Sequence, residues 1–289
     1  MTGSRIFDFK LYGATDRRRL VAKPFVEGRG RLCYAGFMPR QANIDLSALV
    51  VVLVRPRFPE NIGAAARVVA NMGLGGLRVV EPQRPWKEPM QRLASTCGRA
   101  VLAAMEVYDD LDRALADTVG AAATTARVGY KRGELISPRR AAPELLAWAS
   151  GGKAAMVFGP EDRGLTTSQL DRCQLSVCIP TADASSLNLA QAVMVMAYEL
   201  RLAALEAKQA PPAGPQPASH GEMMGLHRHL MDGLVAIGTL KKDNPAHFYR
   251  PIKNVIERGR PSSREVRAMR GIARQMLWLA GQIQDKDGE

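Results

Sequence analysis

Between residues 47 and 208, short apolar runs alternate with longer stretches that have helical spacing. The runs are rich in valine and alanine, which is typical of buried strands, and predict strands over 50–54, 77–80, 106–108, 119–124, 154–158 and 175–179. Between them, apolar residues recur three and four positions apart, as on one face of a helix. This order predicts an α/β domain with a mostly parallel sheet covered by helices on both faces. Its ligand is expected outside the carboxyl ends of the strands.

The pattern changes after the last predicted helix, which ends near residue 207. Residues 209–221 contain a proline-rich stretch and are interpreted as a linker. Residues 222–289 show helical spacing throughout, and Ser262 to Glu265 resembles a capping box ahead of a further apolar stripe. We therefore predict an α/β body over 47–208 and a small all-helical, basic C-terminal extension over 222–289. The first 46 residues show no clear period and are interpreted as a basic N-terminal arm, flexible or unstructured.

Charge divides the chain in the same way. The 289 residues include 40 Lys and Arg against 28 Asp and Glu, a formal net charge of +12. Residues 1–46 carry 9 basic and 4 acidic residues, 47–208 carry 19 and 16, and 209–289 carry 12 and 8. Most of the excess thus lies outside the body. It favours a polyanionic partner, and charge alone does not choose between nucleic acid and an anionic membrane surface.

Several classes of protein are excluded by what the pattern lacks. The longest apolar runs have seven residues, too few to span a bilayer, and no secretory signal is visible, so we expect a cytoplasmic protein without a membrane partner. All four histidines lie between residues 220 and 247, so neither a metal site nor a Ser-His-Asp site is expected in the body. No GxGxxG follows the first strand, and the glycine-rich Gly159 to Thr166 has Leu165 where a P-loop needs lysine.

Three glycine- and asparagine-rich corners remain, each at the end of a predicted strand. The first runs from Pro56 through Asn61 and Gly63 to Arg67, with Asn61 interpreted as a helix cap. The second is the stretch 157–165, and the third begins at Ile179 and includes Ser186 and Asn188. Taken singly, each residue could be only a cap, a turn residue or a surface arginine. Taken together and in order, they favour one functional site.

These corners resemble the three motifs of the SPOUT superfamily of RNA methyltransferases, in its SpoU/TrmH group, and are most similar to TrmJ-type tRNA 2'-O-methyltransferases. The resemblance covers about residues 48–205, and the tail around residues 248–260 is similar to the TrmJ extension. It implies a C-terminal trefoil knot, S-adenosyl-L-methionine as the cofactor, and a homodimer whose site is completed at the interface. The implied cofactor-binding residues are Thr124, Thr125, Ala126, Gly159, Ile179, Ser185, Ser186 and Leu187. Thr125 departs from the usual Thr-Ser-Ala-Arg motif by one residue.

The implied reaction is methyl transfer to a ribose 2'-hydroxyl, which must lose its proton as it attacks. The resemblance implies that Arg67 acts either as the base or by positioning and charge stabilisation. It would serve the cofactor of its own subunit or that of the partner. Asn61, Glu161, Ser186 and Asn188 would orient ribose, arginine and cofactor. A 2'-hydroxyl target makes RNA, and not DNA, the expected partner.

We therefore expect methylation of tRNA at position 32 of the anticodon loop. The alternatives are an enzyme acting on rRNA or on another tRNA position, and an inactive RNA-binding homologue.

Overall fold

The computed structural model describes residues 24–27, 31–34, 44–127, 135–182, 186–207 and 217–286. Residues 1–41 and 42–289 form two compact units. No described helix is long and apolar enough to cross a membrane.

The N-terminal unit contains two antiparallel strands, β1 (Pro24–Glu27) and β2 (Arg31–Tyr34). The pattern of residues 1–46 does not predict them, because each strand has only four residues. Gly28 and Gly30 stand between the two runs. Glycine in a short connection is a hairpin signal, and it could have revealed these strands.

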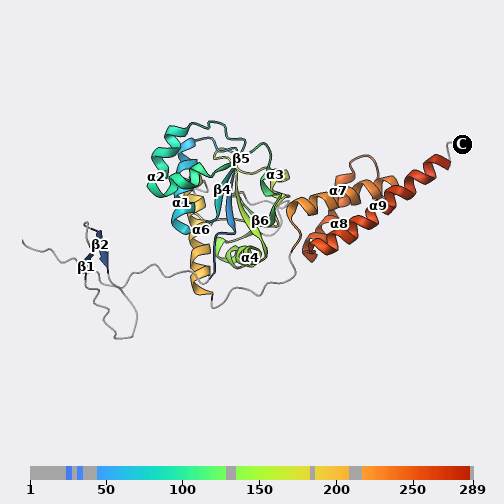
Figure 1. Ribbon diagram of the computed structural model, residues 1–289. Helices are drawn as coiled ribbons and strands as arrows, with labels where there is room; N and C mark the ends of the chain where they lie inside the picture. Colours follow the sequence, from blue (N-terminus) through green and yellow to red (C-terminus); the bar gives the residue numbers. More distant parts are fainter. Residues whose placement is uncertain are drawn as a thin grey trace, which may run out of the picture. The chain divides into compact units, whose positions relative to one another are not determined.

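A parallel sheet of seven strands forms the centre of the second unit. Its strands are β3 (Leu49–Val54), β4 (Gly76–Val80), β5 (Glu106–Tyr108), β6 (Thr118–Thr124), β7 (Leu135–Ile136), β8 (Lys153–Phe158) and β9 (Leu175–Val177). They lie in the order β5-β4-β3-β8-β6-β9-β7. Figure 1 labels β4, β5 and β6. The six predicted strands are confirmed, with ends that differ by at most two residues. Strand β7 was not predicted, because two residues are too few to show a period.

Both faces of this sheet are buried, as its uninterrupted apolar runs predict. All six residues of β3 are buried. Leu49, Val51 and Leu53 belong to one apolar cluster, and the alternate residues of β3 belong to another. This two-sided burial is the reason why the strands read as continuous valine runs without polar alternation.

In the described residues the helices that accompany the sheet are α1 (Pro59–Met72), α2 (Lys87–Ala103), α3 (Leu111–Leu115), α4 (Pro138–Gly151), α5 (Thr167–Leu170) and α6 (Leu189–Glu206). Side chains of α1, α4 and α6 complete the first apolar cluster, and side chains of α3 and α5 complete the second. In Figure 1, α1 and α6 lie on one side of the sheet and α3 lies on the other. The predicted α/β fold, with helices on both faces, is thus confirmed.

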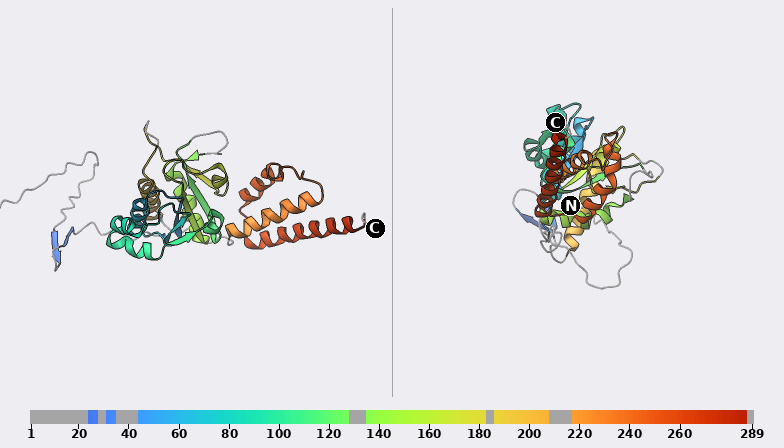
Figure 2. Two further views of the ribbon diagram at one scale, coloured as in Figure 1. Left: turned by 90° about the horizontal axis from the view of Figure 1, so that it is seen from above. Right: turned by 90° about the vertical axis from the view of Figure 1, so that its right-hand side faces the viewer.

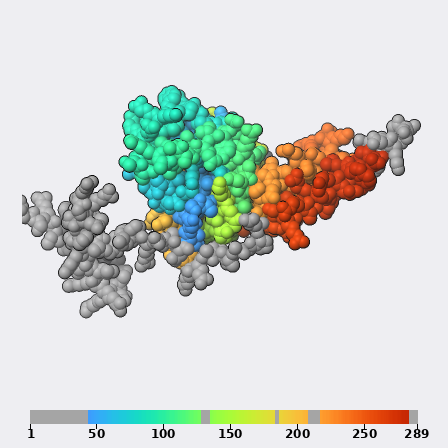
Figure 3. Space-filling model, in the orientation of Figure 1, coloured from blue at the N-terminus to red at the C-terminus, as the bar shows by residue number. Residues whose placement is uncertain are grey.

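Helix α2 packs closely on α1 and covers much of the face seen in Figure 3. Gly63 of α1 permits this approach, because a Cβ there would lie 2.0 Å from the carbonyl oxygen of Met90 in α2. Any larger residue at this position would push the two helices apart.

The C-terminal extension consists of α7 (His220–Ala236), α8 (Pro245–Gly259) and α9 (Ser263–Lys286), which lie together in Figure 2. Its small core comprises Ala218, Leu226 and Val266 with partly buried neighbours. The predicted capping box is confirmed: the Ser262 amide donates to the Glu265 carboxylate at 2.7 Å, and the Glu265 amide donates to the Ser262 hydroxyl at 3.4 Å. The described part of the extension is all-helical, as predicted.

Polar contacts join the extension to the α/β body. The Gly221 amide donates to the Ala116 carbonyl at 3.0 Å. His220 Nε2 lies 3.3 Å from the Asp112 carboxylate. A third contact joins Lys253 of α8 to the carbonyl of Asp171 at 2.9 Å. Hydrogen bonds thus connect both α7 and α8 to the body.

Candidate active site

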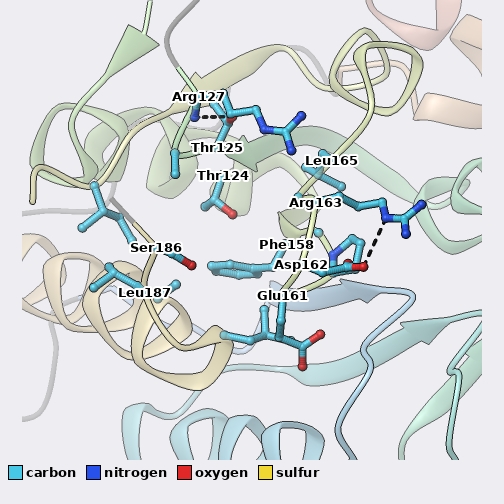
Figure 4. Close-up of a pocket in the computed structure, with 17 residues that line it drawn as sticks. Thr124, Thr125, Arg127, Phe158, Glu161, Asp162, Arg163, Leu165, Ser186 and Leu187 are labelled. Carbon is cyan, nitrogen blue, oxygen red and sulfur yellow. Dashed lines mark hydrogen bonds and ion pairs between the residues drawn. The ribbon is translucent and has the colours of Figure 1, made fainter. Parts of the chain in front are cut away.

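A pocket lies at the carboxyl ends of β6, β8 and β9, where the fold predicts a ligand. Figure 4 shows Thr124 and Thr125 on one side of the Phe158 ring, with Glu161 on the other. Ser186 and Leu187 face this ring from across the pocket. The residues that line the pocket are Thr124, Thr125, Ala126, Arg127, Phe158, Gly159, Pro160, Glu161, Asp162, Arg163, Gly164, Leu165, Ile179, Ser186, Leu187, Leu189 and Ala192.

Seven of the eight residues expected to hold the cofactor line this pocket, and they come from three separate loops. They are Thr124, Thr125, Ala126, Gly159, Ile179, Ser186 and Leu187. The eighth, Ser185, lies outside the described residues. The structure therefore brings together residues that are up to 63 positions apart in the sequence.

The loop after β8 folds back tightly on itself, and glycines make this possible. Gly164 has a φ of +60°, which side chains rarely adopt, and its amide donates to the Pro160 carbonyl at 2.8 Å. A Cβ on Gly159 would lie 2.3 Å from the amide nitrogen of Leu165. Both glycines are therefore needed for the shape of this loop.

The loop after β6 is fixed by its two threonines. The Thr124 hydroxyl donates to the Val157 carbonyl of β8 at 3.1 Å. The Thr125 amide donates to the Val177 carbonyl of β9 at 2.9 Å, and the Thr125 hydroxyl accepts from the Arg127 amide at 3.1 Å. These bonds join the ends of the three strands that carry the pocket.

A chain of side-chain hydrogen bonds connects the three motif corners; we call Asn61, Glu161 and Asn188 the amide relay. Asn61 Nδ2 donates to the Glu161 carboxylate at 2.6 Å. Asn188 Nδ2 in turn donates to Asn61 Oδ1 at 2.9 Å. Asn61 is only 7% exposed, so its amide has little access to water as an alternative partner.

The Glu161 carboxylate also accepts backbone hydrogen bonds from the first corner. The amides of Arg57 and Phe58 donate to it at 2.9 and 3.4 Å. These two donors were not predicted, because backbone groups carry no sequence signal. Glu161 thus lines the pocket while it fixes the chain that enters α1.

Two predictions about helix caps have different outcomes. Asn188 caps α6, since its Oδ1 accepts from the amides of Ala190 and Gln191 at 2.9 and 3.3 Å. Asn61 is not a cap, contrary to the prediction: α1 begins at Pro59, and Phe58 occupies the cap position without a side-chain bond. Proline suits a first helical position, and it starts the helix two residues before Asn61.

Arg67 lies apart from the residues that line the pocket. Its side chain is exposed on α1, and no hydrogen bond or ion pair connects it to another residue of the described segments. Its backbone packs on α2, where a Cβ on Gly98 would lie 2.9 Å from the Arg67 amide. The structure therefore places Asn61, Glu161 and Asn188 together and leaves Arg67 outside this group.

Charged residues at the rim of the pocket were not predicted. Asp162 and Arg163 form an ion pair at 3.2 Å. Desolvation works to raise the pKa of Asp162, but the Arg163 hydrogen bond and the charges of Arg163 and Arg57 outweigh it and hold that pKa below its ordinary value. The residues described contain no group of three His, Cys, Asp or Glu side chains suited to a metal ion.

Known proteins resemble this chain in both of its parts. Residues 48–198 match the SpoU rRNA Methylase family, and residues 221–287 match the tRNA methyltransferase TrmJ, C-terminal domain. A Pseudomonas aeruginosa relative named tRNA (cytidine/uridine/adenosine-2'-O-)-methyltransferase TrmJ is 34% identical over 78% of this chain and 93% of its own. The Klebsiella pneumoniae tRNA (cytidine/uridine-2'-O-)-methyltransferase TrmJ is 33% identical over 78% and 95%.

A solved structure shows the same similarity. The crystal structure of TrmJ from Z. mobilis aligns with a TM-score of 0.67 at 30% sequence identity. The alignment covers 78% of this chain and 98% of the Z. mobilis chain.

Proposed function

The chain belongs to the SpoU rRNA methylase family, and from this membership we infer that it is an S-adenosyl-L-methionine-dependent methyltransferase that modifies the ribose 2'-hydroxyl of tRNA. The observation that carries the inference is the amide relay beside the pocket, because it joins all three motifs into one site. An inactive RNA-binding homologue would have no reason to keep this hydrogen-bonded set intact.

The pocket suits S-adenosyl-L-methionine by the chemistry of its lining. Phe158, Leu165, Ile179 and Leu187 offer apolar contact for the adenine, and the hydroxyl of Ser186 faces the same space. Glu161 and the rim carboxylate of Asp162 favour a ligand with positive charge. When bound, this cofactor supplies an electrophilic methyl group.

The amide relay would act by holding the Glu161 carboxylate in one orientation. The carboxylate accepts three hydrogen bonds, from the Asn61 side chain and from the amides of Arg57 and Phe58. A carboxylate held in this way can orient a ribose hydroxyl or a positive charge without having to reorient during the reaction. Ser186 and Asn188 enter the site from the third corner and would orient the ligand there.

We assign Arg67 a positioning role, in which it binds an RNA phosphate and stabilises charge beside the attacking hydroxyl. A guanidinium is almost always protonated, which argues against a role as general base. Because Arg67 lies outside the pocket lining of its own chain, we propose that it serves the pocket of a partner subunit. A homodimer is further supported by α6, where Met194 and Tyr198, one turn apart, are 37% and 51% exposed.

Mixing two inactive variants tests the shared site. Arg67→Ala and Glu161→Ala each disable one element, and a mixed dimer would keep one complete site. Activity of roughly a quarter of the wild-type value after co-refolding is expected, since half of the dimers are mixed and each has one working site of two. No recovery would show that both residues serve the same chain's pocket.

The C-terminal extension would hold the tRNA. Between residues 241 and 274 it carries ten basic residues against three acidic ones, Asp243, Glu257 and Glu265. Such charge contacts phosphates and gives affinity without reading sequence. The ribose hydroxyl makes RNA the substrate and DNA a non-substrate.

Two finer features remain proposals. A trefoil knot is supported by the close joining of the β6, β8 and β9 ends and by family membership. A crystal structure traced through residues 128–134 and 183–185 would test it. A cytoplasmic location stays a prediction.

Methylation at position 32 is proposed from the resemblance to TrmJ-type enzymes. Labelled S-adenosyl-L-methionine, unmodified tRNA and mapping of the methylated nucleotide test the function directly. Transfer to rRNA or to another tRNA position would support the alternative target, and no transfer to any RNA would leave an inactive RNA-binding protein.

A further inference from the structure

Two arginine–aromatic pairs lie at the carboxyl ends of the neighbouring strands β3 and β4. The guanidinium carbon of Arg57 is 5.4 Å from the centre of the Phe58 ring. That of Arg84 is 5.7 Å from the centre of the Trp86 ring. We call these four residues the arginine–aromatic ledge. Neither the pocket lining nor the amide relay uses their side chains.

Both rings are unusually accessible for large aromatic side chains. Phe58 is 42% exposed and Trp86 is 60% exposed. Stacking of a guanidinium on each ring leaves the rest of the ring open to a ligand. An exposed aromatic face next to a positive charge is the arrangement that single-stranded nucleic acids favour, because bases stack and phosphates are neutralised.

The ledge is anchored and not merely a pair of loose surface side chains. The amides of Arg57 and Phe58 donate to the Glu161 carboxylate. The Gln83 amide of the second loop donates to the Pro56 carbonyl of the first at 3.2 Å. The backbones of both loops are therefore fixed to each other and to the pocket.

The ledge also continues the edge of the sheet on which the pocket lies. Strand β3 pairs in parallel with β8 on one side and with β4 on the other. The loops after β3 and β4 thus follow directly from the loop after β8, which carries Glu161. A ribose placed at the pocket would leave its neighbouring nucleotides next to the ledge.

The ledge could contact either a second copy of this chain or an RNA strand, and its charge distinguishes between them. Arg57 and Arg84 form no ion pair with any carboxylate in the described segments. A second copy of the ledge would bring like charges together, whereas an RNA strand would bring phosphates. The exposed rings alone would suit either occupant, and the arginines favour the RNA.

We propose that the arginine–aromatic ledge stacks unpaired bases of the RNA substrate that flank the methylated nucleotide. This inference rests on the proposed function, since it assumes that an RNA ribose enters the pocket. Phe58 would receive the base nearer to the reacting ribose, because its loop contacts Glu161. Trp86, on the next loop, would receive the base beyond it.

Steady-state kinetics with unmodified tRNA test the ledge. Phe58→Leu and Trp86→Leu keep apolar bulk but remove the ring, and each should raise the KM for tRNA about tenfold. Phe58→Tyr and Trp86→Phe keep a ring, so their KM for tRNA should stay within about twofold of the wild-type value. The affinity for S-adenosyl-L-methionine and the thermal unfolding midpoint should not change. A KM for the Leu variants within twofold of wild type would overturn the proposal.

Sedimentation of the same variants separates the two occupants. If Phe58→Leu raises the KM and also dissociates a dimer, the ring serves a subunit contact and its assignment to RNA is wrong. An unchanged oligomeric state with a raised KM supports the ledge.

Tryptophan fluorescence gives a readout that does not depend on catalysis. The chain has three tryptophans, of which Trp148 is 4% exposed. In a Trp278→Phe background, unmodified tRNA should quench Trp86, and Trp86→Leu should abolish the quenching. Quenching without methyl transfer would refute the proposed function but keep the ledge. Methyl transfer without quenching would refute the ledge at Trp86.

Discussion

The α/β body and the C-terminal extension differ in charge and in the size of their apolar cores. The body, residues 47–208, carries 19 basic and 16 acidic residues and buries two apolar clusters around its sheet. The extension has 12 basic and 8 acidic residues over 209–289, and its apolar cluster has only three buried members. Its α8 and α9 leave Val255, Ile272 and Trp278 between 57% and 60% exposed.

This difference indicates which region requires side chains in fixed positions. Chemistry depends on atoms that stay in place, and the amide relay is held by a deep core. Binding of a polyanion depends on charge, which tolerates a thin core and exposed side chains. Substitutions of Arg67 and of the amide relay should therefore change kcat, and substitutions in the extension should change tRNA affinity and its salt dependence.

The largest effect is expected at Arg67. Arg67→Ala should lower kcat by roughly 10² to 10³-fold, as the loss of a positioned charge-stabilising donor does. Because the side chain is exposed and unpaired within the described segments, unfolding and cofactor affinity should be unchanged. Arg113→Ala, at a residue with a 71% exposed side chain on α3, is the matched control. Wild-type turnover of Arg67→Ala would remove this residue from the mechanism.

The next effect concerns the amide relay. Asn61→Ala removes a buried amide and leaves the half-buried Glu161 carboxylate and the exposed Asn188 amide each short of a partner. Its cost in unfolding free energy should be about 1–3 kcal/mol, together with a lower kcat. Urea unfolding measures the first quantity and methyl transfer the second. Asn254→Ala, on the exposed surface of α8, should change neither, and equal behaviour of the two variants would contradict the relay.

A smaller effect is expected in the salt dependence of binding, which should differ between the two regions. Raising the salt concentration should weaken tRNA binding strongly and S-adenosyl-L-methionine binding little. Arg264→Gln and Arg274→Gln should each reduce the slope of log affinity against log salt by about 0.9, if each contacts a phosphate. Filter binding measures the slope, and calorimetry measures the cofactor. Unchanged slopes would show that the extension does not bind the RNA.

The smallest effect concerns the joint between the regions. Hydrogen bonding to His220, reinforced by Arg172, outweighs desolvation and lowers the pKa of Asp112 to about 2. Because this pKa is depressed in the folded state, the stability it contributes is present above about pH 4 and is lost as the pH falls towards 2. The carboxylate is 37% exposed, so about 1 kcal/mol is expected. Unfolding from pH 5 to 2 should therefore be less pH-dependent in Asp112→Asn; identical profiles would exclude this joint.

The sequence predicts those features that arise from local pattern. The central strands follow from runs rich in valine and alanine, because burial on both faces leaves no polar alternation. Strand β5, whose Glu106 and Val107 are exposed, lies at the edge of the sheet. The capping box at Ser262 follows from residues three positions apart. The seven pocket-lining residues were found through resemblance to known motifs, and their individual roles in binding stay predictions.

Features that depend on long-range geometry were not predicted. Asn61 was interpreted as a cap because asparagine favours that position, but Pro59 starts the helix earlier. That Asn61 instead binds Glu161 and Asn188 depends on how three distant loops meet. The hairpin of β1 and β2 and the two-residue β7 are too short to give a period.

The hydrogen bond between Asn61 and Asn188 also determines when the site can form during synthesis on the ribosome. The two residues are 127 positions apart, and Glu161 lies 100 positions after Asn61. At about 5–20 residues per second, Asn188 is made roughly 6 to 25 seconds after Asn61. A nascent chain can therefore build most of the sheet while its site is still open. Catalytic competence begins only when the last of the three corners has been synthesised.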